Sequence, residues 1–500
     1  MRKASARKAA AKKPAPSRPA AGPAQAAGAG VLVVNIIPQS LSAERNQDSE
    51  PMLAVNPTNA NHIAATAFTP DPAHGLSAPY YVSTDGGNTW GLNAVVPGGE
   101  MTADITVAFS GAADKLYAGI LRQDSPFPIT RMNILRADDF SSNVPMTVLD
   151  DRQQPDQPFT QAATVSSGAD TGKERLYVGN NDFAASPQTA TLDVSLDAGS
   201  ANPAIQSIRL EHRDTGGQDG PQVRTAVHSD GTVYSAFYGW RAQTGDFQTN
   251  TLVVTADVVV TRDDAWGAGG AAFQALVDPA DNLPGLRVAQ GVQFRFSSAG
   301  TDDTGQQRLG GTLSIAVDPR AQQSGTVYIA WGADEADTGF TIHVRRSTNN
   351  GATWSANDLL TLPRATNAAL AVNSNGVLAL LYQQLTGLGP GQRWDTHVQR
   401  SNDGGVNWVD IMLATTPSGE PKKAFPDGFD PYLGDYIHML AVGKDFYGIF
   451  SANNTPDNTH FPSGIVYQRN ADFNTRRLLG LDNATEVQVS IDPFFFKLTG

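Results

Sequence analysis

Acidic residues stand at comparable points along the chain, each just before a short apolar run. If their side chains face one axis, their mutual repulsion would raise some pKa values or recruit a cation. An oxygen-only ring of this kind suits calcium or the hydroxyls of a sugar. The alternative is that each Asp caps the loop entering its strand by bonding nearby backbone N–H groups. The residues are Asp48, Asp104, Asp156, Asp219 and Asp435.

Arginines occupy similar points where the Asp is missing. Arg308 precedes LGGTLSIAV, Arg364 precedes ATNAALAV, and Arg45 lies three residues before Asp48. Arg224 also follows Asp219 by five residues. A planar guanidinium matches a carboxylate with two hydrogen bonds, so Arg45, Arg308 and Arg364 are candidates to bind an acidic ligand. The alternative is that they are exposed loop arginines of little energetic weight.

The elements that position these residues are predicted to be strands. The same phrase recurs, an apolar run, a turn and an aromatic-rich run, as in MLAVNPTNANHIAATAF (52–68) and TAVHSDGTVYSAFYGW (225–240). Alternating strands separated by turn signals indicate an all-β repeat protein. The 48 glycines and 31 prolines supply turns, and the absence of cysteine excludes disulfides and thiolate sites.

A second motif marks the turns between strands. STDGGNTW (83–90), STNNGATW (347–354) and SNDGGVNW (401–408) predict a hairpin turn in which Asp and Ser side chains bond the backbone and Trp anchors the turn in the apolar body. Its role is structural rather than catalytic. The residues predicted to have this structural role are Asp85, Trp90, Asn349, Trp354, Asp403 and Trp408.

Weaker copies of the turn motif, anchored at Asp138, Asp197, Asp263 and Asp472, bring the anchors to seven, with separations of 53, 59, 66, 86, 54 and 69 residues. Each interval fits one four-stranded blade, so residues 31–500 are predicted to form a single seven-bladed β-propeller. Either VLVVNII (31–37) or TEVQVSI (485–491) should complete the last blade. The stretch 267–311 should form an excursion in or beside the fifth blade.

Residues 1–30 form a basic Ala/Pro-rich tail that is expected to be disordered. Residues 1–18 hold seven Lys/Arg and no acid, whereas the whole chain carries a net charge of −13. The tail is a solubilising extension, an address for export or loading machinery, or a tether to an anionic surface or nucleic acid. It lacks the apolar core of a secretory signal, so the expected location is cytoplasmic or reached by a non-classical route. The acidic propeller should bind no nucleic acid, and VLVVNII is too short to span a membrane.

The turn motifs, together with SEPMLAVNPTNANHI (49–63), DQPF (156–159) and LGDYIHM (433–439), resemble the bacterial Asp-box (BNR) repeat β-propellers of the sialidase-like superfamily over residues 45–475. Because sialidases have six blades, a six-bladed ring is the alternative to seven.

The resemblance also implies a glycoside hydrolase with its site at the axial mouth. Tyr436 would be the nucleophile, with Glu50 or Glu211 as its partner. Asp48 or Asp104 would be the acid. A ligand carboxylate would be held by Arg45, Arg308 and Arg364, with Asp156, Asp219 and Asp435 as further binding residues.

Three functional hypotheses follow from the sequence. The first is a sialidase-like hydrolase acting on glycans. The second is a non-catalytic glycan- or protein-binding propeller whose acidic mouth holds its ligand or calcium. The third is a cargo protein targeted by its basic tail. No H-E-x-x-H, G-x-S-x-G, P-loop or dinucleotide fingerprint is present to indicate other chemistry.

Overall fold

The computed structural model describes residues 30–68, 80–93, 96–97, 101–111, 114–123, 130–246, 249, 251–296, 311–337, 339–419 and 433–500. The predicted basic tail, apart from Gly30, lies outside these residues. Within the described ranges, the helices are three-residue 3₁₀ turns, η1 (Gln39–Leu41), η2 (Gly389–Gly391) and η3 (Asn458–His460). No helix found there has the length and hydrophobicity needed to cross a membrane.

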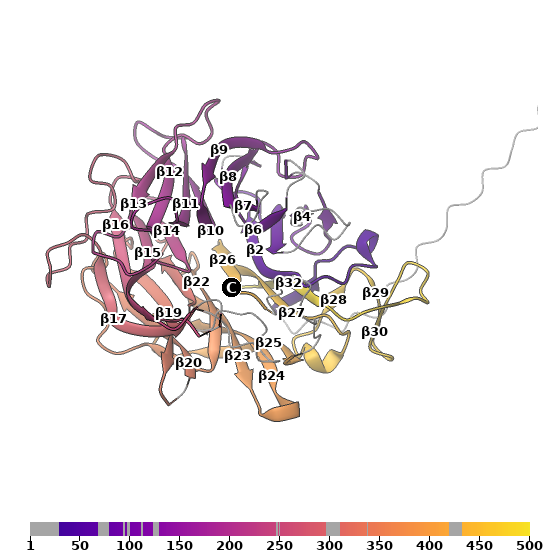
Figure 1. Cartoon of the computed structure of the whole chain (residues 1–500). Helices are drawn as coiled ribbons and strands as arrows, with labels where there is room; N and C mark the ends of the chain where they lie inside the picture. The colour runs from indigo at the N-terminus through magenta and orange to yellow at the C-terminus, as the bar shows by residue number, and fades with distance from the viewer. Residues whose placement is uncertain are drawn as a thin grey trace, which may run out of the picture.

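Seven sheets follow one another around a common centre (Figure 1), and the predicted seven-bladed β-propeller is confirmed. Each of the first six blades is a four-stranded antiparallel meander that starts with its innermost strand, because short turns join strands that are neighbours in sequence. The first three blades are β2 (Ser49–Val55), β3 (Ile63–Phe68), β4 (Tyr80–Ser83) and β5 (Gly91–Leu92); β6 (Thr102–Phe109), β7 (Leu116–Gln123), β8 (Thr130–Ala137) and β9 (Thr147–Gln153); and β10 (Pro155–Thr164), β11 (Glu174–Asp182), β12 (Thr189–Ser195) and β13 (Gln206–Arg209).

The next three blades repeat this order with longer strands. They are β14 (Val223–Val227), β15 (Val233–Thr244), β16 (Val253–Asp263) and β17 (Leu286–Arg295); β18 (Leu313–Val317), β19 (Val327–Glu335), β20 (Gly339–Ser347) and β21 (Leu360–Pro363); and β22 (Ala365–Val372), β23 (Leu378–Thr386), β24 (Arg393–Ser401) and β25 (Val409–Pro417). The stretch 267–311 was expected in or beside the fifth blade. It instead supplies β17, the outer strand of the fourth blade.

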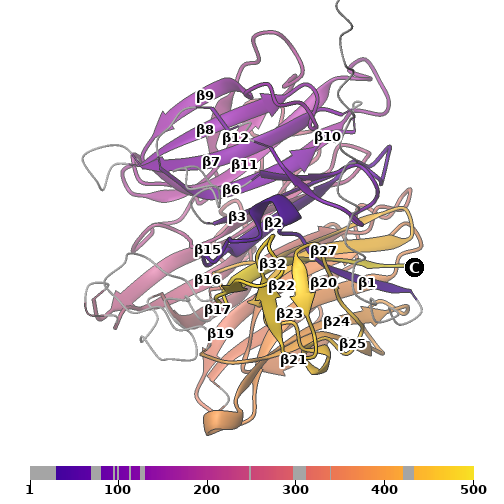
Figure 2. The same cartoon turned by 90° about the vertical axis from the view of Figure 1, so that its right-hand side faces the viewer.

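The two ends of the chain close the ring in the seventh blade. Its strands are β26 (His438–Val442), β27 (Asp445–Asn453), β32 (Ile491–Leu498), β1 (Val31–Asn35) and β28 (Val466–Tyr467), in that order. The antiparallel pair β1–β32 places Val33 opposite Phe496, and Figure 2 shows β27, β32 and β1 together at the closure. Of the two segments predicted to complete this blade, VLVVNII does so, whereas Glu486–Val487 of TEVQVSI form β31 in a separate small sheet.

A small sheet lies outside the blades. It contains β29 (Asn470–Asp472), β30 (Arg477–Leu479) and β31 (Glu486–Val487). Asp472, the anchor of the weak turn copy, is the last residue of β29 in this small sheet, so its use as the seventh blade's anchor is wrong. The seventh blade takes its third strand from β32, and its fourth strand from the other end of the chain.

The turn at 83–90 shows how the repeated motif stabilises a blade corner. The Ser83 hydroxyl accepts the Gly87 N–H at 3.0 Å, and Asp85 Oδ1 accepts the Thr89 N–H at 2.9 Å. The Trp90 indole donates to the Gly87 carbonyl at 3.0 Å and its ring packs against Phe495. Trp90 is buried, whereas Trp354 and Trp408 in the sister turns are half-buried. In the sister turns, Asn349 and Asp403 accept backbone N–H groups from the residues four positions later.

Candidate functional site

Residues 433–437, here called the crossing segment, lead into β26 and are held by several blades at once. Glu50 of the first blade accepts the Asp435 N–H at 2.9 Å. Gln222, just before β14 of the fourth blade, donates to the Asp435 carbonyl at 2.9 Å. Asn367 of the sixth blade donates to the Gly434 carbonyl at 3.1 Å. The segment therefore lies across the axis at the amino ends of the innermost strands.

β-Bulges aim several of these side chains inward. The pairing of the innermost strand shifts between Ser49 and Met52 in the first blade, with similar shifts in the third and sixth blades. Within these bulges Glu50, Gln157 and Asn367 have φ values of 50°, 52° and 58°. Non-glycine residues rarely adopt this left-handed conformation, and bulges re-aim side chains. The three polar side chains are thereby turned away from the normal strand alternation.

Tyr436 forms a buried pair with Asp104. Its hydroxyl donates to Asp104 Oδ1 at 3.0 Å, and both residues are at most 5% exposed. Burial is the main cause that raises the pKa of Tyr436 well above its usual value, and the charges of Asp104 and Glu50 add to it. The phenol is therefore protonated at neutral pH, and Asp104 is the group positioned to take its proton.

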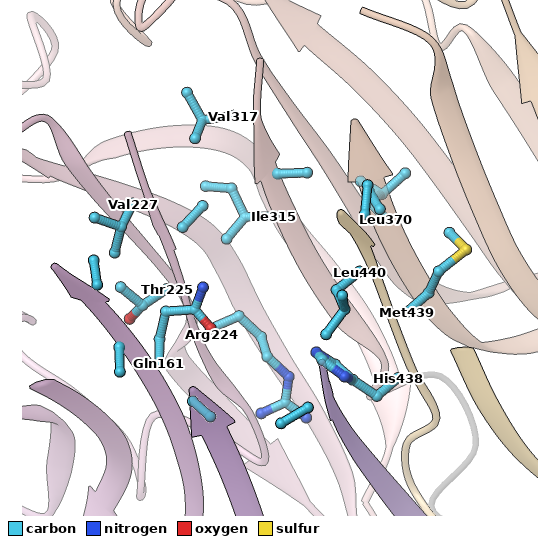
Figure 3. A pocket seen from close by; sticks show the side chains of 18 of the residues that line it. Gln161, Arg224, Thr225, Val227, Ile315, Val317, Leu370, His438, Met439 and Leu440 are labelled. Carbon is cyan, nitrogen blue, oxygen red and sulfur yellow. The ribbon is translucent and has the colours of Figure 1, made fainter. Parts of the chain in front are cut away.

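An axial cavity of about 560 Å³ extends from the crossing segment along the innermost strands. Aliphatic side chains form most of its wall, and Figure 3 shows Val227, Ile315, Val317, Leu370 and Leu440 around it. Small residues keep the axis open, because each innermost strand contributes at least one alanine. One from each strand is Ala54, Ala108, Ala162, Ala226, Ala316, Ala371 and Ala441.

Arg224 on β14 is the single Asp, Glu, Lys or Arg among the described residues that line the cavity. It is only 6% exposed, and in the described part of the chain it forms no ion pair. Its guanidinium carbon lies 4.0 Å from the ring centre of Phe159 and 5.6 Å from that of Tyr436. Burial lowers the pKa of Arg224 to about 10, and the charges of Asp104, Asp435 and Glu50 oppose this shift, so it remains a cation at neutral pH.

His438 lies beside Arg224 in the cavity (Figure 3). Its ring packs against Phe159 with centres 5.8 Å apart. Burial is the main cause that lowers the pKa of His438 to about 4, and the charge of Arg224 contributes to this shift. The imidazole is therefore neutral at pH 7, and Arg224 provides the cavity's positive charge.

Several residues predicted for the site are brought together at the crossing segment. Asp104, Glu50 and Tyr436 meet there, and Asp435 belongs to the segment itself, with Gln157 donating to its Oδ2 at 3.4 Å. Their catalytic and binding roles remain predictions.

Other predicted residues lie apart from this cluster. Asp48 is fully buried. Burial is the main cause that raises the pKa of Tyr81, and the charge of Asp48 adds to it, ahead of Glu44 and Asp492. Asp156 accepts the N–H of its neighbour Gln157 at 2.9 Å, which is the contact of a loop cap, and Asp219 accepts the N–H of Trp240 in β15 at 2.9 Å.

The two predicted arginines that the structure describes, Arg45 and Arg364, do not meet at the axis. Arg45 is exposed and donates to Gln488 at 3.1 Å, and Arg364 donates to the Gly387 carbonyl at 3.2 Å. Neither lines the axial cavity. Arg308 lies outside the described residues. Glu211, the other predicted partner for Tyr436, is instead fully buried and forms an ion pair with Arg241 at 2.8 Å.

The sequence reasoning did not select Arg224, Gln157, Gln222 or Asn367. For Arg224 a signal was available, since it is the one charged residue in the apolar run VRTAV of β14. The amides gave a weaker signal, because their inward direction depends on bulges that no residue type marks uniquely. Within the described ranges, no group of three or more His, Asp or Glu side chains is arranged to hold a metal ion.

Comparisons with known proteins identify similar folds only. No family model matches the chain, and no curated protein matches it. The α-L-arabinofuranosidase Arb93A from Fusarium graminearum aligns with a TM-score of 0.41 and 11% identity over 74% of this chain and 97% of that one. The α-L-arabinanase from Penicillium chrysogenum, solved with arabinobiose, aligns with a TM-score of 0.40 and 11% identity over 92% of this chain and 97% of that one. YCF48 bound to a D1 peptide gives 0.39 and 11% over 86% and 96%.

Carbohydrate-active β-propeller hydrolases are thus among these similar structures. The identities and scores are too low to transfer an activity. The fold is a seven-bladed β-propeller with an axial cavity. Among the described residues that line this cavity, Arg224 is the one cation, and the crossing segment closes one end.

Proposed function

We propose that this β-propeller binds a small molecule carrying an anionic group in its axial cavity, with Arg224 as the anchor. The observation that carries the proposal is a guanidinium only 6% exposed that faces the cavity. A buried charge is costly unless it is paired, so a site of this kind favours a ligand of opposite charge. Phe159 supports the guanidinium from one side at 4.0 Å and fixes its position.

The nearby acids limit this positive charge without cancelling it at the cavity surface. Asp104 accepts from Tyr436, Glu50 accepts from the Asp435 N–H, and neither carboxylate lines the cavity. Arg224 and Tyr436 do line it. The ligand is therefore expected to carry a single negative charge rather than several, because Coulomb repulsion from Asp104, Glu50 and Asp435 grows with ligand charge.

Calorimetric titration with a panel of carboxylates tests this function. Benzoate, dodecanoate, glucuronate and N-acetylneuraminate sample flat, aliphatic and sugar-like anions. At least one should bind, and Arg224→Gln should weaken it by about tenfold or more, because a charge-assisted hydrogen bond contributes roughly 1.5–3 kcal/mol. Arg364→Gln, which removes a guanidinium outside the cavity, is the matched control and should leave binding unchanged.

The pH profile supplies an independent readout of the same anchor. Since the pKa of Arg224 is about 10, affinity should stay constant between neutral pH and about pH 9 and fall as the pH rises through 10. The proposal is refuted if no carboxylate binds, or if binding is indifferent to Arg224→Gln.

A second candidate is glycoside hydrolysis of the sialidase-like kind, favoured by the 3.0 Å Tyr436–Asp104 pair beside Arg224 and by the resemblance of the turn motifs to Asp-box proteins. Asp104 would take the Tyr436 proton while the phenolate attacks the anomeric carbon, and Glu50 would protonate the leaving oxygen. Asp435, Asp156 and Asp219 would be binding residues in this candidate.

A screen on fluorogenic glycosides, with and without calcium, tests hydrolysis. Tyr436→Phe removes the nucleophile and keeps the ring, so it should abolish turnover while the protein stays folded. Asp435→Asn and Asp104→Asn should each lower turnover by about tenfold or more. Turnover retained in Tyr436→Phe would exclude this mechanism.

A further inference from the structure

We propose that the ligand of the axial cavity is an amphiphilic carboxylate, with its acid group on Arg224 and an aliphatic chain along the apolar wall. This inference rests on the ligand-binding function proposed above and specifies the chemical class. The cavity combines one buried cation near its closed end with walls of Val, Ile, Leu and Ala. That distribution fits a molecule with one charged end and an otherwise apolar body.

Several polar groups of the wall already have hydrogen-bond partners within the protein. The hydroxyl of Thr225 is bonded to Ser235 at 2.9 Å, and that of Ser314 accepts the Leu370 N–H at 2.9 Å. Gln222 uses both ends of its amide, on the Asp435 carbonyl and on the Leu313 N–H at 3.0 Å. A sugar needs a polar partner for each hydroxyl that it buries, and these three side chains are already engaged within the protein.

The middle of the cavity is apolar on the side facing Arg224 as well. Ile315 and Val317 come from the fifth blade, and Leu440 from the seventh. Figure 3 shows these side chains around the same space as the Arg224 guanidinium. Each methylene buried here would contribute about 0.8 kcal/mol, so affinity should rise with chain length until the cavity is filled.

The length and volume of the axial cavity suit a ligand whose carboxylate lies at the closed end. Arg224 lies near the crossing segment, and His228, four residues further along the chain, lines the end of the cavity just beyond β14. Four residues of extended strand span roughly 13 Å. The volume of about 560 Å³ lies within the usual range for small-molecule sites. The acid group would therefore lie at the closed end and the chain would run toward His228.

The length of the ligand's aliphatic chain and the charge of its head group can be varied separately in a binding experiment on the full chain of the protein. The probes are dodecanoate, hexanoate, the uncharged dodecanol and the tail-free glucuronate, titrated calorimetrically. Dodecanoate should bind more tightly than each of the other three by about tenfold or more. Arg224→Gln should remove the preference for dodecanoate over dodecanol without changing the affinity for dodecanol.

A second variant tests the tail end of the site. Ala441 is partly exposed in the cavity wall, so Ala441→Leu should fill space along the chain path. This variant should lower the affinity for dodecanoate by about tenfold and leave the affinity for hexanoate nearly unchanged. Arg364→Gln is again the control, and thermal unfolding checks that each variant is folded.

The outcomes separate this inference from the function on which it rests. If glucuronate binds more tightly than dodecanoate and its binding depends on Arg224, the inference of an amphiphilic ligand is wrong, but the proposed anion-binding function holds. If the native protein binds dodecanoate and dodecanol with equal affinity, the inference that Arg224 binds the carboxylate of the ligand is wrong. If none of the four probes binds, the inference fails, and the proposed function fails with it if benzoate and N-acetylneuraminate do not bind either.

Discussion

Asp219 gives the clearest prediction of how stability depends on pH, because its carboxyl group is fully buried at a left-handed loop position with a φ of 55°. Burial raises the pKa of Asp219 to about 7, although the Thr215 hydroxyl and the Trp240 N–H stabilise its ionised form. The folded protein therefore retains this proton at pH values where the unfolded chain has released it.

The sign and size of the effect follow from that difference. Between pH 3.8, the unperturbed value, and about 7, the folded state binds more protons than the unfolded state, so stability falls as the pH rises. Each pH unit contributes about 1.4 kcal/mol, which gives a loss of about 4 kcal/mol across the window and no further change above it. Asp219→Asn keeps the shape of the side chain and does not titrate, so it should lack this slope.

Urea unfolding of Asp219→Asn and of the native protein, followed by tryptophan fluorescence at several pH values between about 4 and 8, measures the difference directly. Subtracting the two curves cancels the other acids. Asp403→Asn is the matched control, since hydrogen bonds lower the pKa of Asp403 well below this window and its effect should be constant across it. A variant Asp219→Asn whose stability follows the native slope would refute the reasoning.

Three further predictions concern stability. Glu44→Gln should flatten the loss of stability between pH 4.5 and about 8 in urea titrations, because burial and then Asp492 raise the pKa of Glu44 to about 8; an unchanged slope would contradict this. Trp90→Ala should cost about 3–5 kcal/mol through cavity formation and leave carboxylate binding intact, so loss of binding in the folded variant would contradict its structural role. Gly434→Ala should lower the free energy of unfolding by about 1–3 kcal/mol in thermal unfolding, because the φ of Gly434 is 83° and a Cβ there would lie 2.6 Å from the Glu50 nitrogen. An unchanged stability would show that the crossing segment is not tightly held.

Much of the fold could be predicted from the sequence because the blade is a repeated local unit. Each full turn motif lies between the third and fourth strand of a blade, as Asp85 and Asp403 show. The seventh blade broke this pattern. Its third and fourth strands come from opposite ends of the chain, so no local turn marks it, and the copy at Asp472 was assigned to it wrongly.

The candidate site was less predictable because its geometry depends on long-range contacts. The sequence placed Asp104 and Tyr436 at the ends of different blades, and the structure joins them at 3.0 Å. It gave no sign that residues 433–437 would lie across the axis, since the amides that hold this segment come from distant blades. Arg224 was visible as one charge in an apolar strand, but period-two alternation alone does not separate solvent from an internal cavity.

The most direct test of the central claim is a crystal structure of the full chain grown with a terminally brominated dodecanoate. The proposed site predicts an anomalous bromine peak inside the axial cavity, on the side of His228, and a carboxylate within hydrogen-bond distance of Arg224. Arg224→Gln crystals grown in the same way should lack both features. An empty cavity in the native protein, or bromine bound only on the outer surface, would contradict the assignment of the axial cavity as the ligand site.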